Sequence, residues 1–207
     1  MIQINNLTLQ KNYQILCDVS LVLNKGNIYG VVGPNGSGKT TLLRAIAGLE
    51  DYDGTIQIES NLQEFSKVMY LENSSWLNTN LTGTDYLNFY QTIWGGNATK
   101  EDIKQSIEFW EMSHYIDDRI GRYSLGMKQK LLLSLYMLSP TPFYLLDEPT
   151  IGLDKSSVKL FYSWVQKIKK ENKIVLFSSH YDSDILALCD HILEIDNKKI
   201  SMKDSEG

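Results

Sequence analysis

Apolar and polar residues alternate along the first part of the chain, which is the pattern of half-buried β-strands. The alternating apolar positions are Ile2, Ile4, Leu7, Leu9, Val19, Leu21 and Leu23. An apolar run over residues 28–32 then predicts a strand that is buried on both faces. We therefore expect the chain to begin with β structure.

The hydrophobic period changes to that of helices after this strand. Leu42, Leu43, Ile46 and Leu49 recur at helical spacing, and Gly48 stands where such a helix should end. Asp53-Gly54 is a turn signal, and Ile56 and Ile58 alternate after it. The pattern thus predicts a helix and a further strand.

A second change begins at about Trp76, where helical periods take over. One stripe contains Tyr86, Leu87, Tyr90, Ile93 and Trp94, and Gly95-Gly96-Asn97 breaks it. Thr99 and Asp102 resemble an N-terminal cap for the next stripe, which contains Ile103, Ile107 and Trp110. A further helix is expected over 125–138, stopped by Ser139-Pro140. Residues 76–139 are therefore predicted to be a helical insertion within a β-rich frame.

Strands and helices alternate in the last part of the chain. Buried strands are expected over 143–146 and 174–177, a helix through Phe161, Trp164, Val165 and Ile168, a short helix over 185–188, and a terminal hairpin around Asn197. This alternation predicts an α/β fold, and the length of 207 residues suits one domain, 1–207, that contains the insertion.

Composition adds little to this prediction. A content of 43% hydrophobic and 22% charged residues is that of a globular protein. The formal net charge of -5 argues weakly against a nucleic-acid partner, and none is expected. The longest apolar-rich run, 131–138, is too short to cross a bilayer, so a membrane process would need another chain.

The stretch that follows the buried strand 28–32 reads G-P-N-G-S-G-K-T-T. Its glycines let the backbone curl so that N–H groups point inward at phosphate oxygens, and the following helix adds the positive end of its dipole. Lys39 can reach the β- and γ-phosphates, and the Thr40 hydroxyl can hold Mg²⁺. The candidate nucleotide contacts are Gly33, Pro34, Asn35, Gly36, Ser37, Gly38, Lys39, Thr40 and Thr41.

Two acids follow the apolar strand 143–146. Asp147 is expected at the carboxyl end of the strand, where open α/β sheets bind ligands, and can hold Mg²⁺ through water. Glu148 can orient or deprotonate an attacking water. Two solvated acids at a strand exit are the alternative, which the phosphate loop makes the poorer reading.

Five ordered motifs give the chain a more specific resemblance. They are the phosphate loop, the stretch 123–127 (Y-S-L-G-M), the acidic strand, the stretch 152–154 (G-L-D) and the stretch 178–180 (S-S-H). Together they resemble an ATP-binding cassette (ABC) ATPase domain over nearly the whole chain. The resemblance implies a phosphate-loop nucleoside triphosphatase with a mixed β-sheet core, an N-terminal antiparallel β-subdomain and an inserted α-helical subdomain.

The same resemblance implies roles for single residues. Ser124 and Gly126 match the family's signature motif, which contacts the γ-phosphate of ATP held by the other subunit of a dimer. Asp154 matches a loop that communicates across that dimer. His180 matches the switch histidine, and it joins Lys39 and Glu148 as a candidate catalytic residue. ATP and Mg²⁺ are the implied cofactors.

The chain departs from the family pattern at several positions. Leu125 replaces the first signature glycine, and Met127 replaces the signature glutamine. The family has a glutamine in the loop that enters the helical insertion, as a Mg²⁺ ligand and coupling residue. Asn73 occupies that place, with Glu72 as the alternative. The family also stacks adenine on an aromatic side chain near the N-terminus, for which Tyr13 is favoured over Gln10.

The resemblance implies the ATPase subunit of a membrane transporter. Such a subunit forms a homodimer or heterodimer and drives a separate transmembrane permease from the cytoplasmic face of the membrane. The form of the stretch 123–127 and the short chain resemble exporters of drugs, lantibiotics or peptides. A non-transport ABC ATPase acting on ribosomes or DNA is the alternative. Its relatives usually carry tandem cassettes, coiled coils or zinc inserts, and this chain has none. A small-molecule kinase would leave the signature motif unexplained.

Overall fold

The computed structural model of the chain describes residues 1–59, 68–93, 98–180 and 186–204. Its contacts divide the chain into two compact units. Unit 1 comprises Met1–Tyr70, Thr141–Glu148 and Val165–Gly207, and unit 2 comprises Leu71–Pro140 and Pro149–Trp164. Unit 2 therefore takes in the predicted insertion, 76–139, and also Pro149–Trp164.

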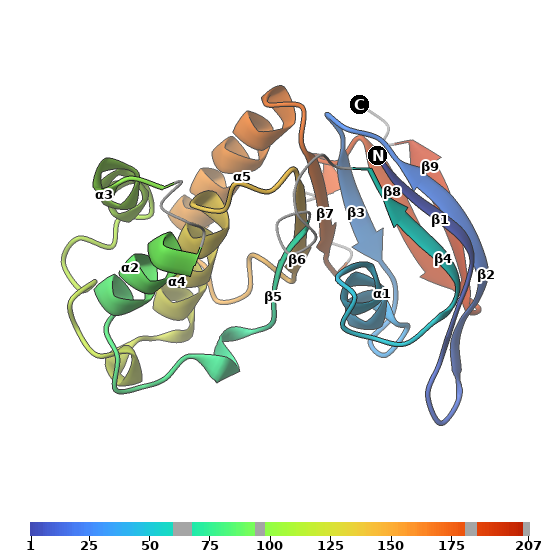
Figure 1. Ribbon diagram of the computed structural model, residues 1–207, viewed down its shortest axis with the longest axis horizontal. Coiled ribbons are helices and arrows are strands. Elements are labelled where there is room, and N and C mark those ends of the chain that lie inside the picture. The colour runs from blue at the N-terminus through green and yellow to red at the C-terminus, as the bar shows by residue number, and fades with distance from the viewer. Residues whose placement is uncertain (60–67, 94–97, 181–185, 205–207) are drawn as a thin grey trace. The chain divides into compact units, whose positions relative to one another are not determined.

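Unit 1 contains two sheets (Figure 1). The three-stranded sheet has the order β2 (Gln14–Leu23), β1 (Ile2–Gln10) and β4 (Asp53–Ile58), with antiparallel pairs. The six-stranded sheet has the order β5 (Val68–Leu71), β6 (Phe143–Asp147), β7 (Ile174–Ser178), β3 (Ile28–Val32), β8 (His191–Asp196) and β9 (Lys199–Asp204). Parallel pairs join β6, β7, β3 and β8, and β9 runs antiparallel to β8. The predicted mixed sheet and antiparallel N-terminal sheet are confirmed.

The apolar residues of β1 stand at positions 2, 4, 7 and 9. Strict alternation would place the third at position 6, so the strand contains one extra residue between Ile4 and Leu7. A register shift in the β1–β2 pairing lies between Ile4 and Leu7, and Asn6 adopts a positive φ of 50° there. The Asn6 N–H donates to Ser20 Oγ at 2.9 Å. This bulge returns the later side chains to the buried face, so Ile2, Ile4, Leu7 and Leu9 are all at most 1% exposed.

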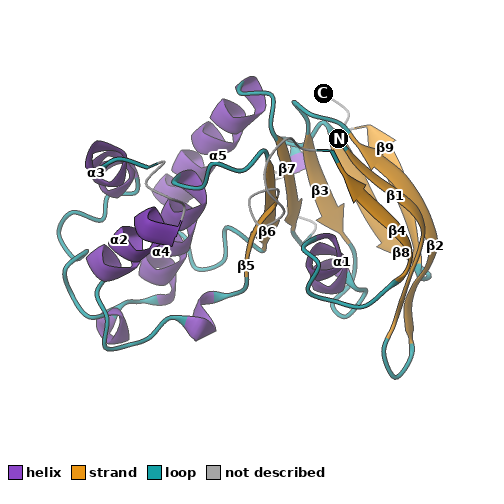
Figure 2. Cartoon of the chain, viewed as in Figure 1, coloured by secondary structure: helices purple, strands orange, loops and turns teal. Residues whose placement is uncertain are grey.

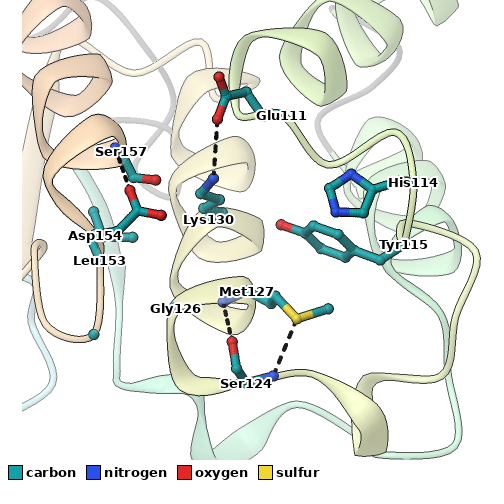
Figure 3. Close-up of a pocket in the computed structure, with 11 residues that line it drawn as sticks. Glu111, His114, Tyr115, Ser124, Gly126, Met127, Lys130, Leu153, Asp154 and Ser157 are labelled. Atoms are coloured by element: carbon teal, nitrogen blue, oxygen red, sulfur yellow. Dashed lines mark hydrogen bonds and ion pairs between the residues drawn. The ribbon is translucent and has the colours of Figure 1, made fainter.

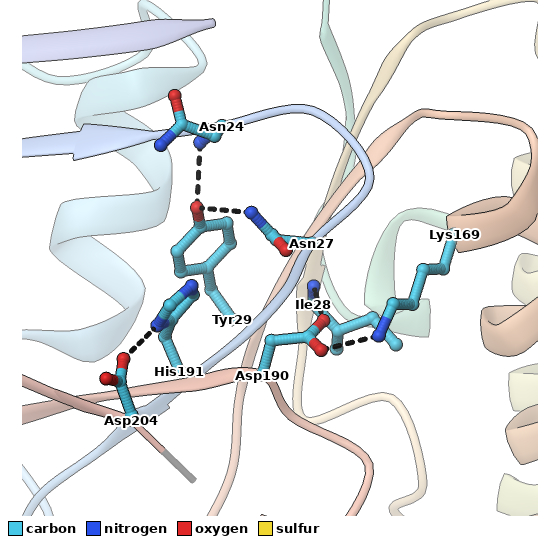
Figure 4. A network of polar contacts seen from close by, with 8 residues as sticks. All are labelled: Asn24, Asn27, Ile28, Tyr29, Lys169, Asp190, His191 and Asp204. Carbon is cyan, nitrogen blue, oxygen red and sulfur yellow. Dashed lines mark hydrogen bonds and ion pairs between the residues drawn. The ribbon is translucent and has the colours of Figure 1, made fainter.

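A polar network fixes the start of β3, the strand that leads into the phosphate loop (Figure 4). The Ile28 N–H donates to Asp190 Oδ2 at 2.9 Å, and Lys169 donates to the other oxygen of that carboxylate. The Tyr29 hydroxyl accepts the Asn24 N–H at 2.7 Å, and the Tyr29 ring stacks on His191. The beginning of the buried strand is therefore held by side chains from several elements of unit 1.

Helix α1 (Lys39–Ile46) follows the phosphate loop and ends just before Gly48, where the sequence predicts its end. The Gly48 N–H donates to Ala45 O and the Leu49 N–H to Arg44 O, which is a Schellman arrangement with Gly48 at a φ of +73°. Leu49 therefore lies outside the helix and is 52% exposed, so its assignment to the helical stripe is wrong.

Unit 2 is helical (Figure 2). Its described elements are η2 (Ser74–Trp76), α2 (Gly83–Ile93), α3 (Lys100–Phe109), η3 (Ile120–Arg122), α4 (Leu125–Met137) and the first part of α5 (Lys155–Lys170). The predicted cap of α3 is confirmed, because Thr99 and Asp102 form a capping box. No helix in the described ranges is long and apolar enough to span a membrane.

The predicted stripes of unit 2 are buried only in part. Tyr86, Leu87, Ile103 and Trp110 lie in the core, whereas Ile93 is 50% exposed. Trp94 and the break at 95–97 lie outside the described residues, as does Ile185 of the short helix predicted over 185–188.

The Asp53-Gly54 pair does not form the predicted turn; it opens β4 instead. Gly54 has a φ of +98°, and a Cβ there would lie 2.5 Å from the backbone oxygen of Asn6. The glycine therefore lets β4 approach the bulge of β1 closely, at the register shift between Asn5 and Thr8.

We predict that Gly54→Ala destabilises the protein more than Gly48→Ala. Both glycines have positive φ, but a Cβ on Gly48 meets nothing within 4 Å. Gly48→Ala should lower the free energy of unfolding by about 1–2 kcal/mol through backbone strain alone. Gly54→Ala should add about 1–3 kcal/mol of overpacking, measured by urea unfolding. Equal losses in the two variants would show that the contact with Asn6 has no effect.

Candidate functional site

The phosphate loop lies between β3 and α1 in unit 1. Gly38 caps α1 in a left-handed conformation, with a φ of 108°. The buried Lys39 ammonium donates to Gly33 O at 2.8 Å and Pro34 O at 3.1 Å. These bonds use two of its three donors, so the third is suited to a phosphate oxygen. The loop thus has the curl and the positive charge that its sequence predicts.

Asp147, the last residue of β6, is held by two hydroxyls in unit 1. Thr40 Oγ1 donates to Asp147 Oδ2 at 2.8 Å, and Ser178 Oγ donates to Asp147 Oδ1. Hydroxyl and carboxylate oxygens are the ligands that Mg²⁺ prefers, and these two of the three predicted metal-binding residues are adjacent. Burial raises the pKa of nearby Tyr70 to about 12, and the charge of Asp147 adds to this rise. The phenol therefore stays neutral beside the carboxylate.

Glu148 follows Asp147 and adopts a left-handed backbone, with a φ of 47°. Its N–H donates to Ser178 Oγ at 2.9 Å. Its Oε1 lies 3.3 Å from His180 Nε2, and both side chains are partly exposed. Two of the three predicted catalytic residues therefore contact each other at the ends of neighbouring strands, where a water could reach them.

A hollow of about 260 Å³ in unit 1 contains most of the predicted nucleotide contacts. Its lining residues are Lys11, Tyr13, Ile15, Asn35, Gly36, Gly38, Lys39, Thr40, Thr41 and Glu148. Tyr13 lies in the β1–β2 loop and is 64% exposed. Gln10 is the last residue of β1 and pairs with Gln14 in the ladder. Of the two candidates for the adenine contact, Tyr13 is the one that lines this hollow.

Helix α4 of unit 2 begins at the predicted signature residues. Ser124 is the N-cap, and its Oγ accepts the Met127 N–H at 3.2 Å. The Ser124 N–H in turn donates to Met127 Sδ at 3.4 Å. The methionine that replaces the family's glutamine therefore completes a capping box through its sulfur, which is a weak acceptor.

The start of α4 packs directly on the loop that carries Gly152. A Cβ on Gly126 would lie 2.4 Å from Gly152 O, and a Cβ on Gly152 would lie 2.8 Å from Leu125 Cγ. The retained signature glycine therefore permits a backbone-to-backbone approach. Leu125 covers Gly152 and is itself 51% exposed.

Asp154 caps α5 by accepting the Ser157 N–H at 2.8 Å and the Ser156 hydroxyl at 2.8 Å. The bonds from the Ser157 N–H and the Ser156 hydroxyl lower the pKa of Asp154 well below its usual range. Ser124, Gly126, Met127 and Asp154 line one hollow of about 340 Å³ in unit 2, beside the Lys130–Glu111 ion pair (Figure 3). The structure thus brings the three predicted trans-nucleotide residues together.

Asn73, the candidate for the family's loop glutamine, caps η2. Its side-chain oxygen accepts the Ser75 N–H at 3.0 Å. In this conformation the amide oxygen that would approach a metal ion already has a partner. Asn73 and Glu72 both lie in unit 2, and the choice between them stays a prediction.

Sequence reasoning missed three polar residues at or beside these sites. Ser178 holds Asp147 and Glu148, Lys11 lines the nucleotide hollow and pairs with Glu50 at 3.1 Å, and Gln129 donates to Pro149 O at 2.9 Å. Ser178 was within a quoted motif, but only the pairing of β6 with β7 brings it opposite Asp147. The only sequence feature that could have indicated Lys11 as a site residue is its position two residues before Tyr13.

The fold and the phosphate loop define a phosphate-loop nucleoside triphosphatase, and comparisons identify its family. A family profile described as "ABC transporter" matches residues 16–151. ABC transporter ATP-binding protein NatA of Bacillus subtilis (strain 168) is 33% identical over 88% of this chain and 78% of its own length. Cytochrome c biogenesis ATP-binding export protein CcmA of Reclinomonas americana is 35% identical over 95% of this chain and 92% of its own.

A solved structure agrees at the level of the fold. The ATP-binding cassette MJ0796, a dimer in a post-hydrolysis state bound to ADP and Pi, matches with a TM-score of 0.86 at 18% identity, over 100% of both chains. The chain therefore belongs to the family of ABC transporter ATP-binding proteins. It is the ATP-binding subunit of such a transporter and an ATPase.

We predict that the acceptor on Met127 controls the start of α4. Met127→Leu removes the sulfur, so the Ser124 amide should exchange its hydrogen faster and stability should fall by about 0.5 kcal/mol. Met127→Gln supplies an amide oxygen and should slow the exchange and raise stability by a similar amount. Hydrogen exchange at Ser124 and urea unfolding measure both effects. Unchanged exchange in Met127→Leu would mean that the sulfur bond contributes nothing.

Proposed function

We propose that this subunit hydrolyses MgATP at the phosphate loop and thereby drives a separate transmembrane permease in export. The whole chain, 1–207, acts as one ATPase domain with a helical insertion. The observation that carries the hydrolytic part is the continuous set of contacts from Thr40 through Asp147 and Ser178 to Glu148 and His180.

ATP binds along the hollow of unit 1. The loop 33–41 surrounds the phosphates, and Lys39 binds oxygens of the β- and γ-phosphates. The positive end of the α1 dipole strengthens the electrostatic attraction for these phosphates. Tyr13 stacks on the adenine, since it is a large exposed ring on the wall of the same hollow. Lys39 then serves twice, because it both binds ATP and stabilises charge that develops on the γ-phosphate.

Thr40 and Asp147 fit Mg²⁺ through an oxygen-only donor set. When bound, the ion neutralises charge on the β- and γ-phosphates. Glu148 accepts the proton of the attacking water as the water oxygen bonds to the γ-phosphorus and the bond to ADP breaks. His180 contacts Glu148 and is positioned for the γ-phosphate. Asn73 is a further candidate ligand of the Mg²⁺ ion.

A second ATPase subunit completes each nucleotide site. Ser124 presents the N-terminal end of α4, an attractive place for the γ-phosphate of ATP held by the partner. Gly126, the second residue of this helix, is the other proposed contact with that nucleotide, and Asp154 on the adjacent loop contacts the partner subunit. The dimeric state of the matched cassette supports this arrangement, either as a homodimer or with a related chain.

Export is supported by one relative. The export protein CcmA is 35% identical over most of both chains, and the form of the stretch 123–127 agrees with exporters of drugs or peptides. Since the membrane part belongs to a permease subunit, the ATPase binds at the cytoplasmic face of the membrane. The predicted cycle is closure of two ATPase subunits on ATP and their reopening after hydrolysis.

The general-base role of Glu148 predicts a separation of binding from turnover. Glu148→Gln should keep the ATP dissociation constant within about threefold, yet lower the hydrolysis rate about 10²- to 10⁴-fold. Because hydrolysis reopens the dimer, ATP should trap Glu148→Gln as a dimer, detected by size exclusion. Glu108→Gln, on the exposed face of α3, is the control and should behave as wild type. Wild-type turnover by Glu148→Gln would refute the assignment.

A second prediction separates Tyr13 from Gln10. Tyr13→Ala should weaken ATP binding about tenfold, since stacking on a base contributes about 1–3 kcal/mol. Binding of tripolyphosphate, which lacks a base, should not change. Gln10→Ala should leave both ligands unaffected. Titration calorimetry measures the four affinities, and the reverse order for ATP would assign the adenine contact to Gln10.

A further inference from the structure

We propose that Ser178 is a positioning residue for ATP hydrolysis, which fixes the metal-binding carboxylate and the general base with one hydroxyl. The inference rests on the proposed roles of Asp147 and Glu148. Its argument begins with the place of Ser178 in the sheet of unit 1.

Ser178 is the last residue of β7 and is fully buried. In the parallel ladder it pairs with Asp147 of β6 on one side and Val31 of β3 on the other. Val31 comes two residues before the phosphate loop. Ser178 therefore stands between the strand that carries the acids and the strand that leads to the phosphates, and its neighbour Ser179 is bonded through its N–H to Val31 O.

The two hydrogen bonds of Ser178 have a fixed direction. The Glu148 N–H can only donate, so Ser178 Oγ accepts this hydrogen bond, with 2.9 Å between Glu148 N and Ser178 Oγ. The single hydroxyl proton of Ser178 then points to Asp147 Oδ1. A hydroxyl that accepts one bond becomes a better donor in the other, and the charge of the carboxylate strengthens it further.

For Asp147 this bond restricts rotation of the carboxylate. Oδ1 accepts from Ser178 while Oδ2 accepts from Thr40 at 2.8 Å. Because both oxygens accept a hydrogen bond, the orientation of the carboxylate plane is fixed before a metal ion binds. Loss of the Ser178 hydroxyl would leave only the Thr40 contact, and Thr40 is itself proposed as a metal ligand. The metal site would then be less well preorganised.

For Glu148 the same hydroxyl stabilises an unusual backbone. A φ of +47° is unfavourable for a glutamate, and the bond from its N–H to Ser178 holds that conformation. His180, two residues beyond Ser178, contacts the Glu148 side chain at 3.3 Å. The end of β7 therefore holds the proposed base through its backbone and through its carboxylate.

The experiment compares Ser178→Ala with wild type. In EDTA, the ATP dissociation constant of Ser178→Ala should stay within about twofold, because the phosphate loop keeps its bonds. The factor by which Mg²⁺ tightens ATP binding should fall about tenfold, and kcat about 10- to 100-fold with a smaller change in KM. The binding measurement needs no turnover and therefore reports on the metal site directly.

Ser106→Ala is the matched control. Ser106 is also fully buried, and its hydroxyl donates only locally, to Ile103 O in α3 of unit 2. After correction for the folded fraction, it should match wild type in the Mg²⁺ effect and in kcat. If Ser178→Ala does not fold, Ser178→Cys keeps a donor and acceptor at this position in a somewhat larger side chain and weakens both bonds, and it should shift the same quantities in the same direction.

A Ser178 variant with the wild-type Mg²⁺ effect and wild-type kcat would overturn the inference. So would equal changes in the Ser178 and Ser106 variants. Failure of the proposed function is recognised separately, by normal turnover in Glu148→Gln. In that background Ser178→Ala should still reduce the Mg²⁺ effect on ATP binding, so the role of Ser178 toward Asp147 is tested even if Glu148 is not the base.

Discussion

The carboxylate of Asp147 is the contact on which the candidate site of unit 1 depends. It accepts from Thr40, at the start of the helix after the phosphate loop, and from Ser178, at the end of the neighbouring strand. Three separate segments of the chain therefore meet at two oxygen atoms. Because both oxygens of this partly buried carboxylate are bonded, the pairing stabilises the junction and fixes the orientation of the group toward a metal ion.

The residue after Asp147 lies at the junction between the two units. Glu148 ends a segment of unit 1, where Ser178 holds its N–H, and Pro149 begins a segment of unit 2, where Gln129 holds its carbonyl. Gln129 belongs to α4, the helix that Ser124 caps. Two adjacent residues are thus each fixed by a buried polar side chain of their own unit. This arrangement connects the proposed base, through the chain itself, to the unit that carries the signature residues.

The signature region shows how a sequence departure is accommodated. The family's glutamine is replaced by Met127, yet its sulfur still accepts the Ser124 N–H and completes the cap. The family's first glycine is replaced by Leu125, whose side chain covers Gly152. The second glycine is retained because any Cβ on Gly126 would meet the Gly152 carbonyl. The tolerated changes therefore lie where side chains can adapt, and the retained residue lies where two backbones touch.

The sequence by itself determined the local features: the phosphate loop, the buried strands 28–32 and 143–146, and the cap at Thr99. These depend on neighbouring residues, so periodicity and residue type suffice to predict them. Only the tertiary structure decided that Gly54 opens a strand, that Ile93 is exposed, and that Ser178 joins Asp147 to Glu148. Each of these depends on a contact, or on the lack of one, with residues distant in the chain. Such a contact is set by strand pairing and packing, which leave no signal in the local pattern.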